Sequence, residues 1–336
     1  MRARWRSLFL LLTIGPIATA GGAHAEDFYK GKIFNIVVGF SPAGGFDTYA
    51  RAVARYLGAH IPGEPTAIVQ NMPGAGSLTS VRYLEMTAPK DGTVMTIFNP
   101  GLVTQSIVEP EKVRLDFRKF AWIGIVTPDY RVCYGFGAKG IKSWDDMMER
   151  KQFIIGATGK GTGNYIDGAI LREVFHAPVR QVQGFPGSAE MRLAIERGEL
   201  DGDCGSLSSI PPEWIAGGEA HPFLRFSHDW PAEFPATAAY IGEFADTDEQ
   251  RQLLHLFSGG DALGRGFVMS RAVPPAQIAI LRKAFNDTMK DPAFVSEMAK
   301  QQLPFHPSSG EEADAIIADL AGVAPPIVAR AKAVYQ

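Results

Sequence analysis

Four segments of the chain each combine a strand-like apolar run, a glycine-rich turn and an amphipathic helical pattern. Their turns read, in chain order, "SPAGGFD", "NMPGAGS", "TGKGTGN" and "GFPGS". A helix that follows a strand returns the chain to the same edge of the sheet, so that the next strand pairs in parallel. Two of these units lie within residues 36–98 and two within residues 153–197. The sequence therefore predicts an α/β protein with two lobes, each a mainly parallel sheet with flanking helices.

The residue patterns also place the individual elements. We expect strands at residues 36–40, 67–70, 93–98, 153–157 and 179–183, and helices at residues 46–57, 165–175, 189–197, 277–290, 293–301 and 311–320. Residues 227–260 follow neither pattern and are rich in proline and acidic residues. The C-terminal helices either form a third unit or return to complete the first lobe. We assign residues 26–127 and 256–336 to the first lobe and residues 128–255 to the second.

The first 25 residues have the three parts of a secretory signal peptide. Arg2, Arg4 and Arg6 give a positive start, residues 8–14 form a short apolar core, and small residues lead to a cleavage site after Ala25. Because none of these arginines is adjacent to another, we expect Sec export rather than the twin-arginine route. No later segment is long and apolar enough to span a membrane. We therefore expect the mature protein to be periplasmic.

Charge and motifs narrow the function further. The chain has a formal net charge of −3 and no basic run, which argues against nucleic acid or a membrane surface as a partner. The segment "GATGKGT" resembles a phosphate-binding loop, but Gly161 follows Lys160 where that loop needs serine or threonine. The sequence contains neither a G-x-S-x-G nor an H-E-x-x-H motif. We expect no catalytic residue, cofactor or metal, and an exported hydrolase or lyase is the less favoured alternative.

The chain has two cysteines, Cys133 and Cys204. In an exported protein they could form one disulfide. They could equally stay reduced as small buried apolar residues. The sequence leaves both open because it does not give the distance between them.

The glycine turns also indicate where a ligand binds. In open parallel sheets, ligands bind at the carboxyl ends of the strands. Helix N-termini at that edge present unpaired N–H groups and partial positive charge, and glycine lets the backbone approach an anion closely. A single glycine turn is most often a simple connector. Two turns in each lobe, however, predict an anion held between facing sets of N–H donors.

Three stretches, in this order, resemble the extracytoplasmic solute-binding proteins of tripartite tricarboxylate transporters, the Bug-type family. They read "IVVGFSPAGGFDTYAR", "VQNMPGAGSLTSVRYLEMTAPKDGTVM" and "VQGFPGSAEMRLAIERGELDGD". The resemblance covers the chain from Lys32 to the C-terminal helices. It implies a type II periplasmic binding protein-like fold whose two lobes close on a small carboxylate.

The resemblance also implies a set of ligand-binding residues. In the first lobe, those that would seat one carboxylate are Ala43, Gly44, Gly45, Phe46, Asp47, Gly74, Ala75, Gly76, Ser77 and Asn99. In the second lobe, those that would read the other end of the ligand are Thr158, Lys160, Thr162, Gly163, Asn164, Phe185, Pro186, Ser188 and Asp203.

Some positions depart from the family pattern. Ala43 takes the place of a glycine, and Phe46 that of a small polar residue, so the ring could narrow the pocket or stack on a planar ligand. Lys160 is the one formal cation within the turns. We hypothesise that it pairs with the distal carboxylate of a dicarboxylate; the alternative is a solvated loop lysine.

We conclude from the sequence that the chain captures a small carboxylate, with a dicarboxylate as the favoured class, and delivers it to a two-component membrane permease. An aromatic carboxylate is the alternative ligand, because Phe46, Phe185 and Tyr165 lie in or beside the turns. A sensor kinase is an alternative partner, and a binding protein for an ABC transporter would have a similar cleft. A monomer is the default oligomeric state.

Overall fold

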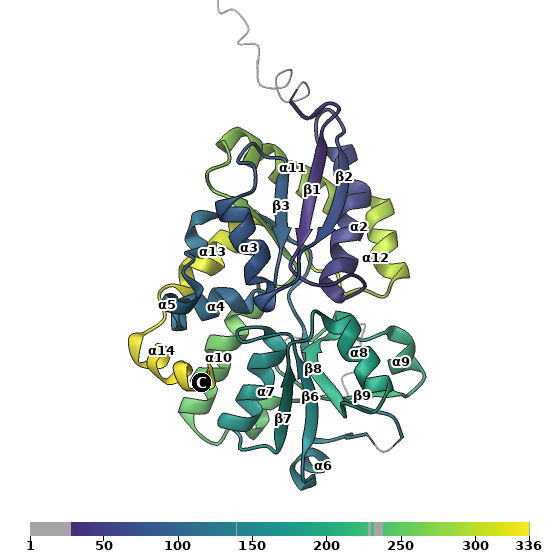
Figure 1. Cartoon of the computed structure of the whole chain (residues 1–336), viewed down its shortest axis with the longest axis vertical. Helices are drawn as coiled ribbons and strands as arrows, with labels where there is room; N and C mark the ends of the chain where they lie inside the picture. The colour runs from purple at the N-terminus through teal and green to yellow at the C-terminus, as the bar shows by residue number, and fades with distance from the viewer. Residues whose placement is uncertain (1–27, 139, 228–229, 232–237, 336) are drawn as a thin grey trace, which may run out of the picture.

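The computed structural model describes residues 28–335 except residue 139 and residues 228–229 and 232–237. The expected signal peptide therefore lies outside the described residues. None of the described helices is long and apolar enough to cross a membrane. The strands form two sheets, one above the other in Figure 1.

The first sheet has the strand order β12-β4-β11-β3-β1-β2. Its strands are β1 (Ile33–Val38), β2 (Thr66–Asn71), β3 (Val94–Ile97), β4 (Phe120–Ile125), β11 (Gly266–Ser270) and β12 (Ser308–Ser309). The second sheet has the order β10-β9-β5-β8-β6-β7. Its strands are β5 (Arg131–Phe136), β6 (Phe153–Ala157), β7 (Val179–Gln183), β8 (Gly202–Ser206), β9 (Ala220–Arg225) and β10 (Ala239–Tyr240).

Strand direction follows the prediction in both sheets. β1 is parallel to β2 and β3, and β6 is parallel to β7 and β8. In each sheet one internal strand is reversed, β11 between β3 and β4 and β5 between β8 and β9. These reversed strands are the ones that enter from the other lobe, since β5 follows β4 and β11 follows the helix α10 (Asp248–Asp261). The predicted two-lobed α/β fold is confirmed.

Helices cover both faces of each sheet (Figure 1). On the first sheet, the helices are α2 (Gly45–His60), α11 (Pro275–Lys290) and α12 (Pro292–Lys300) on one face, and α3 (Leu78–Met86), α4 (Gly101–Val108) and α13 (Gly310–Leu320) on the other. On the second sheet, they are α6 (Trp144–Glu149), α7 (Gly163–Glu173) and α10 on one face, and α8 (Ser188–Glu196) and α9 (Pro212–Ala216) on the other. Side chains along β1 point alternately to the two faces of the first sheet. Ile36 and Val38 therefore pack in the hydrophobic cluster on one face, and Val37 packs in the cluster on the other. The short helix α5 (Pro110–Val113) follows α4.

The C-terminal segment returns to the second lobe. After α13, the helix α14 (Pro325–Ala331) and the turn that follows it place Ala331, Val334 and Tyr335 in the core cluster of the second sheet. The Tyr335 ring also contacts Phe257 of α10. The chain therefore passes between the lobes a third time, after α13.

The first two crossing segments are hydrogen-bonded to each other. The Arg265 N–H donates to the Thr127 carbonyl (2.8 Å), the Val126 N–H donates to the Arg265 carbonyl (3.1 Å), and the Asp129 N–H donates to the Asp261 carbonyl (2.8 Å). These bonds make a two-stranded connection between the lobes.

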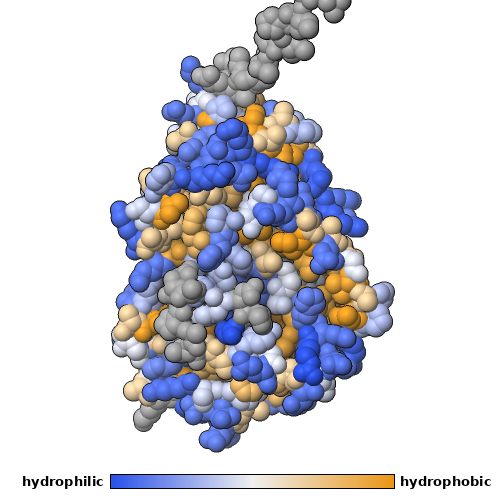
Figure 2. Space-filling model, turned by 180° about the vertical axis from the view of Figure 1, so that it is seen from behind, coloured by the Kyte–Doolittle hydropathy of each residue, from blue (hydrophilic) through white to orange (hydrophobic). Residues whose placement is uncertain are grey.

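On the outside, hydrophilic and apolar residues are interspersed over the face shown in Figure 2.

Cys133 and Cys204 form a disulfide in the core of the second lobe. They lie directly opposite each other on β5 and β8, and both are fully buried. The bond links positions that are 71 residues apart. It therefore joins two central strands of this sheet covalently.

Replacing both cysteines with alanine should lower the free energy of unfolding by about 2–4 kcal/mol, because the unfolded chain regains the entropy of an open loop. Urea unfolding of the double variant measures this, and reduced wild-type protein should show a similar loss. An unchanged transition midpoint in both samples would contradict it.

Candidate functional site

A small cavity lies between the two lobes. Its first-lobe lining consists of Phe40, Gly44, Gly45, Phe46 and Asn99. Its second-lobe lining consists of Arg131, Thr158, Asn164, Ser188, Met191, Asp203, Gly205, Ser206 and Ser209. The cavity has a volume of about 40 Å³. At roughly 10–15 Å³ for each water, it has room for about three water molecules or a few ligand atoms.

Three helices begin at this cavity. Gly45 is the first residue of α2, Gly163 precedes the lining residue Asn164 in the first turn of α7, and Ser188 is the first residue of α8. None of these three helices has a hydrogen bond from its N-cap side chain. The N-terminal ends of these helices, with the positive ends of their dipoles, therefore lie at the cavity from both lobes, an arrangement that favours an anion. In α7 the Tyr165 N–H already donates to Asn164 Oδ1 (3.1 Å).

The glycine turns meet in two pairs across the gap between the lobes. The first turn faces the fourth, since a Cβ atom on Gly44 would lie 2.9 Å from the Ser188 Oγ. The second turn faces the third, since a Cβ atom on Gly76 would lie 2.5 Å from the Thr162 Cγ2. A Cβ atom at either glycine would force the Ser188 hydroxyl or the Thr162 methyl group to shift, so glycine favours this close approach of the lobes.

Side-chain hydrogen bonds also connect the lobes. The Ser41 hydroxyl donates to Glu190 Oε2 (2.7 Å), and Arg192 Nη2 donates to the Ala43 carbonyl (2.7 Å). Arg265, in the second crossing segment, donates through Nη2 to the Ser208 Oγ (2.6 Å). Together with the contacts between the turns, these bonds describe a closed arrangement of the lobes.

The structure brings part of the predicted site to the cavity wall. The predicted residues that line it are Gly44, Gly45, Phe46, Asn99, Thr158, Asn164, Ser188 and Asp203. The predicted residues that are not part of its lining are Ala43, Asp47, Gly74, Ala75, Gly76, Ser77, Lys160, Thr162, Gly163, Phe185 and Pro186. Several residues of the second group hold those of the first in place.

Asp47 and Ser77 show this supporting role. The Asp47 carboxylate accepts hydrogen bonds from the Ala43 N–H (2.8 Å), Arg51 Nε (2.8 Å) and Asn71 Nδ2 (2.9 Å). Burial alone would raise the pKa of Asp47, but these bonds, led by that of Arg51, hold it below its usual value. Ser77 Oγ accepts the Asn99 N–H (3.1 Å). The turns are thus stiffened by their own polar side chains.

Lys160, Phe46 and Tyr165 each lie against other parts of the chain. Lys160 is exposed, and its Nζ donates to the Tyr335 carbonyl (3.5 Å). The Phe46 ring stacks on Phe40, with centroids 4.8 Å apart, and has the Arg265 guanidinium 4.0 Å from its centroid. Phe46 is 7% exposed, so its faces are occupied and the ring narrows the cavity. The Tyr165 ring belongs to the core of the second lobe.

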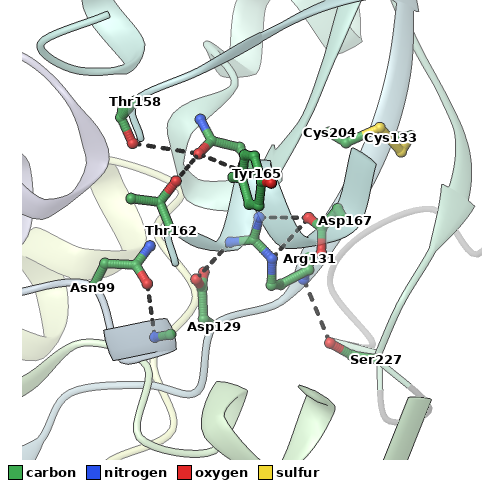
Figure 3. A network of polar contacts seen from close by, with 12 residues as sticks. Asn99, Asp129, Arg131, Cys133, Thr158, Thr162, Tyr165, Asp167, Cys204 and Ser227 are labelled. Carbon is green, nitrogen blue, oxygen red and sulfur yellow. Dashed lines mark hydrogen bonds and ion pairs between the residues drawn. A yellow bond between two sulfur atoms is a disulfide. The ribbon is translucent and has the colours of Figure 1, made fainter. Parts of the chain in front are cut away.

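Arg131 is a lining residue that the sequence analysis missed. Its guanidinium lies between two buried carboxylates (Figure 3), with Nη1 donating to Asp129 Oδ2 (3.0 Å) and Nε to Asp167 Oδ2 (2.9 Å). A Cβ atom on Gly163 would lie 2.2 Å from its Nη1, so the glycine leaves room for the guanidinium against the first turn of α7. Burial raises the pKa of Asp129, but Arg265 and Arg131 outweigh it and leave this pKa below its usual value. Among the described lining residues, Arg131 is the one cation, and its charge is already paired.

Asp203 is the one carboxyl group among the described lining residues. It is 5% exposed, and burial raises its pKa to about 7. Its Oδ1 has no hydrogen-bond partner in the described part of the chain. Within the same part, no group of three or more histidine, cysteine, aspartate or glutamate residues is placed to hold a metal ion.

The chain was compared with protein families, curated proteins and solved structures. No family model and no curated protein matches the sequence. Among solved structures, the chain is similar to the periplasmic binding protein BugD, with a TM-score of 0.74, 17% identity, and 91% of this chain and 98% of that chain covered. It is also similar to MatC from Rhodopseudomonas palustris with bound malate (TM-score 0.71, 16% identity, 91% and 99% covered). A third is Rpa4515 from R. palustris with adipate (TM-score 0.66, 16% identity, 87% and 98% covered). The predicted periplasmic binding protein-like fold is confirmed.

Replacing Arg131 with methionine should lower the free energy of unfolding by about 3–5 kcal/mol, because the buried Asp167 loses its partner and the buried Asp129 keeps only Arg265. Urea unfolding measures the loss. Arg118 offers a matched control, since it pairs with Asp116 at an exposed site, and its replacement by methionine should leave the transition unchanged. Equal, small effects at both positions would show that the buried cluster does not stabilise the fold.

Proposed function

We propose that the chain is a periplasmic solute-binding protein of the Bug type, which holds a small organic acid between its two lobes. The observation that carries this proposal is the convergence of the N-termini of α2, α7 and α8 on one small cavity. The similar structures include binding proteins with malate and with adipate bound. Both of these ligands are small carboxylic acids.

The cavity selects an anion through its backbone rather than through a free positive side chain. Arg131 is neutralised by Asp129 and Asp167, so the attraction for a carboxylate comes from helix dipoles and N–H groups. The small volume limits the part of the ligand held here to a few atoms. A compact aliphatic acid fits these limits better than an aromatic one, since the Phe46 ring already occupies the space beside the turn.

The role in transport follows from export and closure. The N-terminal pattern of a signal peptide supports a periplasmic location, and so does the similarity to periplasmic binding proteins. Closure of two lobes around a ligand is a common hinge motion, and the paired crossing segments supply the hinge. We infer that the closed form delivers its acid to a two-component membrane permease of the tripartite tricarboxylate type. We also propose that residues 324–335 belong to the second lobe rather than the first, because Ala331, Val334 and Tyr335 pack in its core.

Thermal melting of the mature protein against mono-, di- and tricarboxylates, aromatic acids, amino acids and sugars tests this function. The protein is first unfolded, dialysed and refolded, so that no co-purified ligand remains. A small aliphatic acid should raise the midpoint, with about 2.7 kcal/mol of stabilisation at a hundred times its dissociation constant. A response to sugars alone, or to no acid, would contradict the proposal.

A paired set of variants tests the cavity with whichever acid responds. Gly44 has an extended backbone (φ −88°, ψ 170°) that any residue can adopt, so valine there should leave folding intact while its side chain meets Ser188 and prevents closure. We expect the affinity to fall at least about tenfold, or 1.4 kcal/mol. Lys160→Ala is the control and should bind within about twofold of wild type, because Lys160 is not part of the cavity lining. Unchanged binding by the Gly44 variant would place the ligand elsewhere.

A further inference from the structure

Asp203 lies where a ligand would meet it. It is on β8, directly opposite Tyr134 of β5, and it lines the cavity that the three helix N-termini face. A Cβ atom on Gly205, two residues further along β8, would lie 3.0 Å from Asp203 Oδ2. The carboxyl group therefore extends along the strand in the space that this glycine leaves free.

The charged neighbours of Asp203 are already engaged with other groups. The Arg131 guanidinium donates to Asp129 and Asp167, and Arg192 donates to the carbonyl oxygens of Ser209 and Ala43. Asp203 Oδ1 is buried and has no hydrogen-bond partner among the described residues. The described chain thus leaves acceptor capacity on this carboxyl group unused, so a hydrogen-bond donor on a ligand in the cavity would be favoured beside it.

We propose that the bound acid carries a hydrogen-bond donor, a hydroxyl or an ammonium group, in addition to its carboxylate, and that the Asp203 carboxylate accepts from it. This rests on the function proposed above. The cavity then has two unlike ends, helix N-termini for the carboxylate and a carboxyl group for the donor. When Asp203 is ionised, a second carboxylate pointing at it would be repelled, so above about pH 7 an unsubstituted dicarboxylate is a poorer ligand than its hydroxylated or aminated counterpart.

Protonation of Asp203 gives this proposal a pH signature. The titratable and charged groups that act on it are Arg131 and Tyr134 of β5, Asp167 of α7 and Arg192 of α8. Burial raises the pKa of Asp203 to about 7 in the ligand-free protein. A donor on the ligand stabilises the ionised carboxylate, so its binding releases a proton when the group starts out protonated. The affinity should therefore rise as the pH rises through about 7, and fall below it.

Calorimetry with matched probe acids tests the proposal: propionate, lactate and alanine as one series, and succinate, malate and aspartate as the other. In at least one series, the wild type should bind a donor-bearing acid about tenfold or more tightly than the parent acid, as a hydrogen bond to a charged group implies. Asp203→Ala should abolish this preference while changing the affinity for the parent acid by less than about threefold. Asp201→Asn, two residues earlier, just before β8 and outside the cavity lining, should keep the preference.

A second variant identifies the kind of donor. Asp203→Asn keeps an acceptor but loses the charge, so it should retain the preference for a hydroxyl acid and lose that for an amino acid. The rise in affinity between about pH 6 and about pH 8 should also disappear in this variant. Equal binding of parent and donor-bearing acids by the wild type, or an equal loss of both in Asp203→Ala, would overturn this inference alone. Failure of the refolded wild type to bind any carboxylate would overturn the proposed function, and this inference with it.

Discussion

The close approach of the two lobes along their glycine turns is the contact on which the site depends. Gly44 meets Ser188 across the gap, and Gly76 meets Thr162, at distances that a Cβ atom on either glycine would disturb. Because each turn is followed directly by a helix or a helical turn, this approach also brings helix N-termini of both lobes to one point. Closure and anion recognition are therefore one geometric event, and neither requires a free cationic side chain.

The buried cluster beneath the cavity complements this arrangement. Asp129, in the first crossing segment, lies between two arginines. Its Oδ2 is 3.0 Å from Arg131 Nη1, and its Oδ1 is 3.3 Å from Arg265 Nη2. Arg265 also touches the Phe46 ring of the first lobe and Ser208 of the second. The cluster thus connects hinge, cavity wall and both lobes. It fixes the crossing segments by ion pairs while leaving the cavity itself without an unpaired positive charge.

Local chemistry explains what the sequence predicted well. The turns, the helices that follow them and the mainly parallel sheets depend on residue patterns within a few positions, which is why the two-lobed fold could be predicted. The pairing of turns across the lobes depends on how the lobes sit relative to each other, and no local pattern contains that. Arg131 was missed because it opens an apolar strand and resembles an ordinary strand-end charge.

Long-range contacts explain the remaining differences. Lys160 was singled out for its charge, but the returning C-terminal segment provides it with the Tyr335 carbonyl. The return of residues 324–335 to the second lobe could not be predicted, since the amphipathic pattern of this segment suits a contact with either lobe. Asp203, in contrast, was among the ligand-binding residues that the family resemblance implied, and it does line the cavity. Its unpaired oxygen emerges only from the folded surroundings.

In the proposed complex, backbone N–H groups at the N-termini of α2, α7 and α8 hold the carboxylate. Amide proton chemical shifts of the isotope-labelled protein, recorded with and without a saturating small acid, test it most directly. We expect the largest downfield shifts at Gly45, Phe46, Asn164 and Ser188, from both lobes together. Shifts that leave these amides in place and concentrate elsewhere in the chain would contradict it.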